Sequence, residues 1–226
     1  MADSSGKKLD WHFETLPLQT KKALDFLSKE VWIGKAAWYL AGGTALALQA
    51  GHRSSVDLDF FTSERGFDNT RLLQHFLDNK DWRTNINEEG TVYGELFGAK
   101  VSFIAYPFFT PDQELRQYGT IRMLHFLDIA VMKIIAISQR GRKRDFFDLY
   151  WCANNLEPLD KTIRRLKKQY PHVAHDYHHI LKSLVYFTDA ENDPLPKINF
   201  KVGWPEVKKF FRKKIPLITR DIIGLM

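Results

Sequence analysis

Cysteine is scarce in this sequence: its 226 residues include one, Cys152. A single thiol can form no disulfide within the chain and cannot supply the paired cysteines of a common zinc site. Long apolar runs are missing as well. A membrane span needs about 20 consecutive apolar residues, and the most apolar stretch, residues 126–137, is interrupted by Asp128 and Lys133. These absences exclude a disulfide-stabilised secreted domain and a membrane protein, and they indicate a cytoplasmic location.

Glycine and proline are also infrequent, with 13 and 9 residues. Such counts exclude collagen-like and linker-dominated chains. The sequence is 44% hydrophobic and 14% aromatic, which is enough for a packed core and too apolar for a disordered chain. The length fits one large domain or two small ones.

Charge is unevenly distributed along the chain. Residues 1–160 hold 19 Lys and Arg against 21 Asp and Glu, whereas residues 161–226 hold 14 against 6. A basic C-terminal third predicts a surface for a polyanion, and nucleic acid is the main candidate. A charged face that only keeps the protein soluble explains the same pattern equally well.

The hydrophobic pattern changes from strands and helices to helices alone. Its periods predict strands at residues 36–41, 55–61, 92–96 and 100–106, and helices at residues 18–31, 44–50, 68–79, 123–139, 145–155, 161–170, 173–187 and 205–214. This order predicts an α/β (α+β) fold, in which a small mixed sheet flanked by helices is followed by an all-helical C-terminal part. The predicted domains are residues 1–120 and 121–226.

A diglycine bend lies between the first predicted strand and the helix that follows it. Gly42, Gly43 and Thr44 stand at the helix start, where unpaired backbone N–H groups and the helix dipole favour an anion. Glycines let a phosphate approach the backbone, and the threonine hydroxyl can add a hydrogen bond. Taken alone, the same residues are also typical of an ordinary tight turn.

Two aspartates follow on the next predicted strand. Asp57 and Asp59 are two residues apart, so their carboxylates project from one face and repel each other unless a cation lies between them. Mg²⁺ is bound in this way, by one or two carboxylates and the phosphates of a substrate. A solvent-facing strand edge would carry the same spacing. The diglycine bend and the aspartate pair together predict a site for a nucleoside triphosphate.

The segment from Leu40 to Phe61, LAGGTALALQAGHRSSVDLDFF, resembles the Gly-Gly-Thr and Asp-x-Asp signature of the nucleotidyltransferase superfamily with the polymerase-beta-like fold. More narrowly, the chain resembles the AbiEii/AbiGii/MenT-type nucleotidyltransferase-like toxins, many of which are halves of bacterial toxin and antitoxin pairs. Lys133 on a predicted helix, the basic-Asp-x-x-Asp motif at residues 144–148 and the stretch YFTDAENDP at residues 186–194 match that family too.

The resemblance implies a reaction and its ligands. A nucleoside monophosphate would pass from an NTP to a hydroxyl of an RNA, such as a tRNA, or of a protein. Asp57 and Asp59 are implied to hold Mg²⁺, with Mn²⁺ as a substitute, and the diglycine bend and Arg53 are implied to bind the phosphates. An antitoxin protein would be a further partner.

The C-terminal motifs are implied to complete the site. Lys133 would place a cation against the phosphates, and either Asp145 or Asp148 would orient the acceptor hydroxyl or act as the base. The two aspartates are three residues apart, so they share one face of their helix. The structural alternatives are a solvated lysine and a helix N-cap at Asp145.

One position departs from the wider superfamily. Many members place a third carboxylate on a later strand, where this sequence offers Ser102. Toxin-like members often lack this acid as well, but its absence leaves the base open between Asp145, Asp148 and the substrate itself. A catalytically inactive module that binds a nucleotide or a partner is therefore an alternative function, and a purely nucleic-acid-binding protein is a third.

Two side-chain groups in the C-terminal third allow other interpretations. His172, Asp176 and His179 would share one helical face and could bind a metal ion, although a solvated face is the simpler explanation. Aromatic residues between the lysines could stack on nucleobases or pack in a helical core. These residues are Tyr186, Phe187, Trp204, Phe210 and Phe211.

Overall fold

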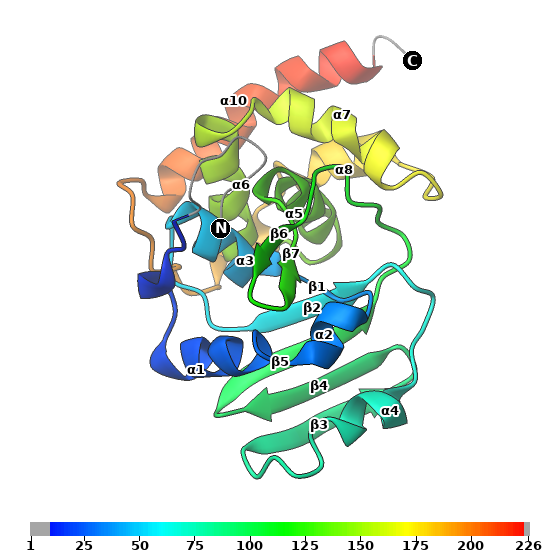
Figure 1. The fold of residues 1–226 in the computed structure, drawn as a ribbon. Coiled ribbons are helices and arrows are strands. Elements are labelled where there is room, and N and C mark those ends of the chain that lie inside the picture. Colours follow the sequence, from blue (N-terminus) through cyan, green and yellow to red (C-terminus); the bar gives the residue numbers. More distant parts are fainter. Residues whose placement is uncertain (1–9, 224–226) are drawn as a thin grey trace. The chain divides into compact units, whose positions relative to one another are not determined.

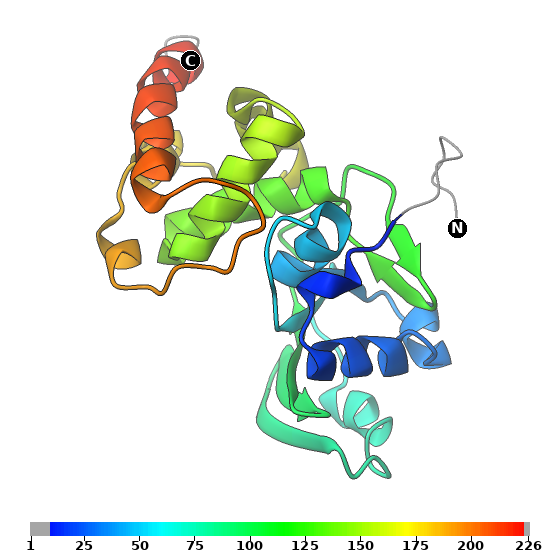
Figure 2. The same cartoon turned by 90° about the vertical axis from the view of Figure 1, so that its left-hand side faces the viewer.

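The computed structural model describes residues 10–223, which divide after Phe126 into two compact units (Figures 1 and 2). The first unit is built on a β-sheet, and the second consists mainly of helices. Residue 120, where the sequence placed the domain boundary, lies in the turn of a hairpin that belongs to the sheet of the first unit. No helix in the described range is long and apolar enough to cross a membrane.

The first unit contains a seven-stranded mixed sheet within its described residues, in the order β3-β4-β5-β2-β1-β7-β6 (Figure 1). β2 is parallel to β5 and β1 is parallel to β7, whereas the other neighbouring strands are antiparallel. The mixed sheet confirms the predicted fold class. The strands are β1 (Tyr39–Ala41), β2 (Leu58–Thr62), β3 (Trp82–Glu88), β4 (Thr91–Leu96), β5 (Ala99–Ala105), β6 (Arg116–Tyr118) and β7 (Ile121–Met123).

Helices of the first unit begin and end close to the predicted positions, with two corrections. The predicted helix at residues 18–31 ends at Leu27, and a second short helix follows it. The predicted helix at residues 68–79 ends at Gln74, and the Asp68 carboxylate accepts a hydrogen bond from the Arg71 N–H at its start (3.0 Å). The helices are η1 (Phe13–Thr15), α1 (Leu18–Leu27), α2 (Val31–Lys35), α3 (Gly42–Ala50) and α4 (Asn69–Gln74).

β2 separates the core of the first unit from the candidate site. Its side chains alternate, so that Leu58, Phe60 and Thr62 are buried on one face and Asp59 and Phe61 are half-buried on the other. The Phe60 ring stacks on Phe103 of β5 with the ring centroids 5.2 Å apart, and rings from α2 and from the turn after α4 pack on Phe103 too. The aromatic core therefore occupies one face of the sheet and leaves Asp59 on the opposite face.

The second unit packs its helices around a cluster of aromatic rings. Phe146 contacts the rings of Phe187, Trp204 and Phe211, all of which are buried. Core packing rather than base stacking accounts for these three rings, whereas Tyr186 is exposed. The helices are α5 (Phe126–Arg140), α6 (Lys143–Asn155), α7 (Leu159–Gln169), α8 (Tyr177–Ser183), α9 (Thr188–Glu191) and α10 (Trp204–Ile223).

The start of α6 is fastened by the segment after α9. Asp193 accepts hydrogen bonds from the Lys143 N–H and the Arg142 guanidinium (both 3.0 Å), and the Lys143 ammonium donates to the Glu191 carbonyl (3.0 Å). Burial raises the pKa of the Asp193 carboxyl, but the hydrogen bonds from Lys143 and Arg142 outweigh it, so that the pKa is lowered overall. The charged form of Asp193 therefore stabilises the second unit.

Replacing this carboxylate tests that stabilisation. Because the folded-state pKa is lowered, the contribution of Asp193 is present above the unfolded-state value of about 3.9 and is lost as the pH falls through the folded-state value. We expect Asp193→Asn to lower the free energy of unfolding by about 1–3 kcal/mol at pH 7 and the difference to shrink below about pH 4. Urea denaturation at both pH values measures it, with exposed Asp221→Asn as the control. A difference independent of pH would contradict this account.

The β6–β7 turn depends on a glycine. Gly119 has a φ of +59°, and a Cβ at this position would collide with the Ser28 carbonyl oxygen at the end of α1. The neighbouring Thr120 N–H donates to the same oxygen (2.8 Å). Moving the turn away from Ser28, or changing the φ of Gly119, would break the hydrogen bond between the Thr120 N–H and the Ser28 carbonyl oxygen.

We expect Gly119→Ala to destabilise the protein by about 2 kcal/mol or more, since strain at positive φ adds to the collision with backbone. Gly66→Ala is the matched control, because no atom lies within 4 Å of the added Cβ there. Thermal unfolding of both variants measures the difference. Equal melting temperatures would show that the turn adapts freely.

Candidate active site

The pairing of β1 with β2 brings the diglycine bend against the aspartates. Ala41, the last residue of β1, pairs with Asp59, so the chain turns into α3 directly beside that carboxylate. A Cβ on Gly42 would lie 2.9 Å from Asp59 Oδ2, and Gly42 has a φ of +71°. Only glycine combines this backbone angle with this close approach. The structure thus places the predicted phosphate-binding bend and the predicted metal-binding strand together.

Arg53 lies against the start of α3. A Cβ on Gly43 would collide with Arg53 Nη2, which shows how close the guanidinium is to the bend. Arg53 is buried, and its Nη1 donates to the Ser54 carbonyl oxygen (2.8 Å). The helix start therefore combines N–H groups that have no carbonyl partner within the helix, the positive end of the helix dipole and a fixed cation, each of which favours an anion.

Thr44 supports the site from inside the protein. It is buried, and its hydroxyl is hydrogen-bonded to Ser55 Oγ (2.9 Å) and to the Asp57 carbonyl oxygen. These bonds hold the segment before β2 to α3. Ser55 was not identified from the sequence, where its only signal is its place two residues before Asp57.

Asp59 is oriented by its neighbour on β5. Ser102 pairs with Asp59 in the sheet, and its buried hydroxyl donates to Asp59 Oδ1 (2.8 Å). Ser102 thus lies beside the aspartate pair, where the sequence placed the counterpart of the third carboxylate. It contributes a hydrogen-bond donor to the site instead of a negative charge.

The donor set fits a hard divalent cation that also binds phosphate. Asp59 lies at the bend, whereas Asp57 precedes β2, which begins at Leu58 and not at residue 55 as predicted. Both aspartates are half-buried, and carboxylate oxygens are ligands that Mg²⁺ accepts. Residues 10–223 contain no group of three or more His, Cys, Asp and Glu side chains that could hold a metal ion. Two carboxylates completed by substrate phosphates are therefore the arrangement that this site can offer.

Comparisons with known proteins agree with this geometry. A family model described as the nucleotidyl transferase AbiEii toxin of a type IV toxin–antitoxin system matches residues 33–95 and 92–217. The chain belongs to this family. The match confirms the resemblance found in the sequence and the enzyme class, nucleotidyltransferase.

Three relatives extend the comparison of this AbiEii-family protein. An uncharacterised protein of Aquifex aeolicus (strain VF5), aq_aa25, is 36% identical over 86% of this chain and 95% of its own length. A nucleotidyltransferase-like protein of Helicobacter pylori has the same fold, with a TM-score of 0.53 and 17% identity over 93% of this chain and 99% of that chain. JHP933 from Helicobacter pylori has a TM-score of 0.52 and 18% identity over 93% and 96%.

In the second unit of the AbiEii-family protein, the predicted lysine and aspartates form one buried cluster. Lys133 Nζ lies 2.6 Å from Asp145 Oδ1 and 2.7 Å from Asp148 Oδ2, and the two carboxylates are 0% exposed. Arg140 Nε lies 3.5 Å from Asp145 Oδ2. The shared face predicted for the two aspartates is confirmed, and the solvated-lysine alternative is wrong. Their roles toward a phosphate and an acceptor stay predictions.

The alternative role of Asp145 as an N-cap is also wrong. α6 begins at Lys143 and its N-cap is Arg142, so Asp145 is the third residue of the helix. Its N–H donates to the Arg142 carbonyl oxygen (2.9 Å). The Asp145 carboxylate does not cap the helix, and it pairs with the Lys133 ammonium.

Other polar groups of the second unit have structural roles. Asp176 caps α8 by accepting from the His179 N–H (3.0 Å), and His179 Nε2 lies 3.0 Å from the Ser138 carbonyl oxygen. These contacts contradict a metal site on this face.

Burial raises the pKa of the Cys152 thiol, so the thiol stays protonated and is not a nucleophile at neutral pH.

The buried cluster makes a sharp stability prediction. Lys133→Met leaves two buried carboxylates without their shared cation, and we expect a loss of about 3–5 kcal/mol in the free energy of unfolding. Replacing Asp145 and Asp148 by Asn in the same chain removes the uncompensated charges and is expected to restore part of the loss. Urea denaturation measures both variants, with exposed Lys182→Met as the control. Wild-type stability of Lys133→Met would refute the charge balance described here.

Proposed function

We propose that this chain is a Mg²⁺-dependent nucleotidyltransferase that moves a nucleoside monophosphate from an NTP to an RNA, such as a tRNA, and acts as the toxin of a toxin–antitoxin pair. The observation that carries the proposal is the diglycine bend packed against the Asp59 carboxylate. A triphosphate bound at that bend would meet the aspartates directly.

Each residue of the first unit has a distinct part in the proposal. Asp57 and Asp59 would hold the divalent cation, which, when bound, neutralises phosphate charge and polarises the phosphoryl oxygens. The N–H groups at the start of α3 would donate to the β- and γ-phosphates, and Arg53 would add a fixed positive charge beside Gly43. Ser102 would keep Asp59 in the orientation that the cation requires.

The proposed step is an in-line displacement. A hydroxyl oxygen of the acceptor forms a bond to the α-phosphorus, the bond from that phosphorus to the bridging oxygen breaks, and pyrophosphate leaves with the electron pair. The hydroxyl proton passes to an oxygen of the triphosphate, because Ser102 supplies no carboxylate beside the aspartate pair. Asp145 and Asp148 both bind the ammonium of Lys133. We therefore assign them the role of holding Lys133 in place and not that of the base.

The acceptor is inferred from the charge of the second unit. Exposed lysines and arginines lie along α7 and α10, and residues 161–226 carry a net charge of +8. Such a surface favours the phosphate backbone of RNA over a protein acceptor of mixed charge. The exposed cations are Lys161, Arg164, Lys167, Lys168, Lys209, Arg212, Lys213, Lys214 and Arg220.

Transfer of labelled phosphate tests the reaction. The full chain with Mg²⁺ is expected to move the label of α-labelled NTP, and not of γ-labelled NTP, to RNA. Asp59→Asn is expected to lower the rate at least about 100-fold, because it removes a ligand worth several kcal/mol of charge stabilisation. Asp78→Asn, an exposed carboxylate in the same unit, is the matched control.

The remaining outcomes separate the alternatives. NTP binding measured by calorimetry, without transfer, would support a catalytically inactive module. This is the second candidate function, because Ser102 stands where many members of the superfamily have a third carboxylate. Transfer of the γ-label would mean a kinase, and labelling of protein in place of RNA would overturn the acceptor. RNA binding that Asp57→Ala leaves unchanged, with no NTP bound, would indicate a nucleic-acid-binding protein.

A further inference from the structure

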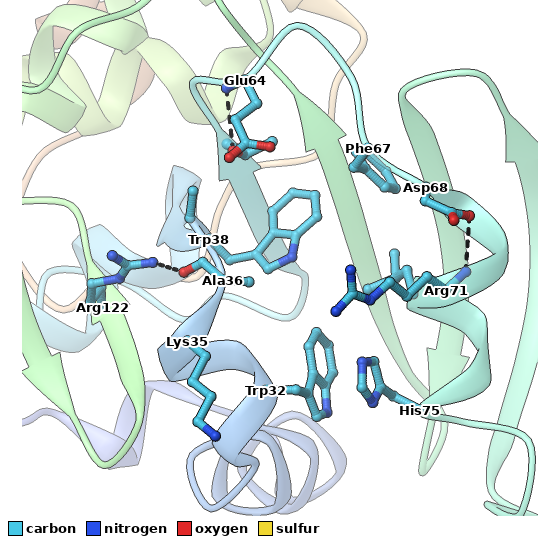
Figure 3. A pocket seen from close by; sticks show the side chains of 13 residues that line it. Trp32, Lys35, Ala36, Trp38, Glu64, Phe67, Asp68, Arg71, His75 and Arg122 are labelled. Carbon is cyan, nitrogen blue, oxygen red and sulfur yellow. Dashed lines mark hydrogen bonds between the residues drawn. The ribbon is translucent and has the colours of Figure 1, made fainter.

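A cavity of about 630 Å³ lies in the first unit, away from the candidate active site (Figure 3). Its wall includes Thr62 of β2, three residues beyond Asp59 and on the opposite face of the strand. The cavity also borders the segment before β1, whereas the diglycine bend follows β1. We call it the aromatic–basic pocket; its main side chains are Trp32, Lys35, Trp38, Arg71, His75 and Arg122.

Flat aromatic groups line the pocket. The Trp32 indole stacks on the His75 imidazole, with centroids 4.5 Å apart and planes 3° from parallel. The Trp38 indole meets the Phe67 ring edge-on at 4.8 Å. Figure 3 shows both indoles at the centre of the view. Trp38 is buried by these contacts, whereas Trp32 is half-buried, so the Trp32 indole is the surface on which a further planar ring can pack.

Positive groups reach the same space. Figure 3 shows the Arg71 guanidinium directed between the indoles of Trp32 and Trp38, and Lys35 lies at the end of α2 and is exposed. Arg122 Nη2 donates to the Ala36 carbonyl oxygen, which fixes this guanidinium at the wall. Arg122 Nε is buried and has no hydrogen-bond partner among residues 10–223, although a buried donor without a partner is costly.

Three cations of the pocket, Lys35, Arg71 and Arg122, stand against two acids, Asp68 and Glu64, so a net positive charge remains. The Asp68 carboxylate is occupied as the N-cap of α4, where it accepts from the Arg71 N–H. Glu64 is exposed at the edge of the pocket and can accept from a hydroxyl or amino group. The pocket therefore offers planar stacking surfaces, donors for an anion and an acceptor at its rim.

We propose that the aromatic–basic pocket binds a nucleotide, either free or as one residue of a single-stranded RNA, at a site separate from the catalytic one. The base would stack on the Trp32 indole, and the phosphate would pair with Arg71. The volume lies within the usual range of about 300–1,000 Å³ for small-ligand sites. The binding depends neither on a divalent cation nor on Asp57 and Asp59.

Titration with AMP in EDTA tests this pocket apart from the metal-dependent reaction. Calorimetry and tryptophan fluorescence of the full chain are expected to show saturable binding at up to millimolar AMP. Arg71→Gln is expected to weaken it about tenfold or more, because a hydrogen bond from a charged group is lost. Trp32→Leu is expected to weaken it as well. Arg83→Gln, an exposed arginine on β3, is the matched control.

A short single-stranded RNA in the same titration identifies the source of the nucleotide. Binding of RNA but not AMP, lost in Arg71→Gln, would support an RNA segment, and binding of AMP would support the free nucleotide. The Asp57→Asn, Asp59→Asn double variant is expected to keep this binding even if it abolishes transfer. The proposal would be overturned if neither AMP nor RNA bound to the wild-type protein. It would also be overturned if folded Arg71→Gln and Trp32→Leu variants bound these ligands as tightly as the wild type.

Discussion

The register between β1 and β2 is the constraint on which the candidate active site depends. Pairing Ala41 with Asp59 fixes where the chain leaves the sheet, and therefore which carboxylate the diglycine bend touches. A shift of one residue would turn Asp59 to the aromatic core, since strand side chains alternate. The bond of Thr44 to the segment before β2 secures this register, and the bond of Ser102 on β5 orients the Asp59 carboxylate.

Local sequence signals predicted the site better than the sheet around it. Gly42, Gly43, Asp57 and Asp59 lie within 18 residues, and the two short elements that carry them have clear periods. β3 was missed because most of its side chains are exposed, so WRTNINE has no hydrophobic alternation to detect. β6 and β7 have three residues each, which is too short for any period.

Side-chain partners were the least predictable part. The spacing of Asp145 and Asp148 showed that they share a helix face, but not that Lys133 of another helix lies between them. Thr44 was expected to face a phosphate, and its hydroxyl is instead bonded within the protein. Such contacts depend on which elements pack together, and the spacing along one element carries no information about its neighbour. The aromatic–basic pocket was missed for the same reason, since its residues come from four separated segments.

The Lys133 cluster has a consequence for how this chain can change over time. The buried Lys133 ammonium pairs with two buried carboxylates, and Arg140 reaches Asp145 from the surface, where its side chain is 54% exposed. In that interior a surplus charge of either sign is expensive. A single replacement at Lys133, Asp145 or Asp148 upsets that balance, whereas paired replacements can keep it. These positions should therefore drift together among descendants of this sequence, with each acceptable substitution opening or closing the next.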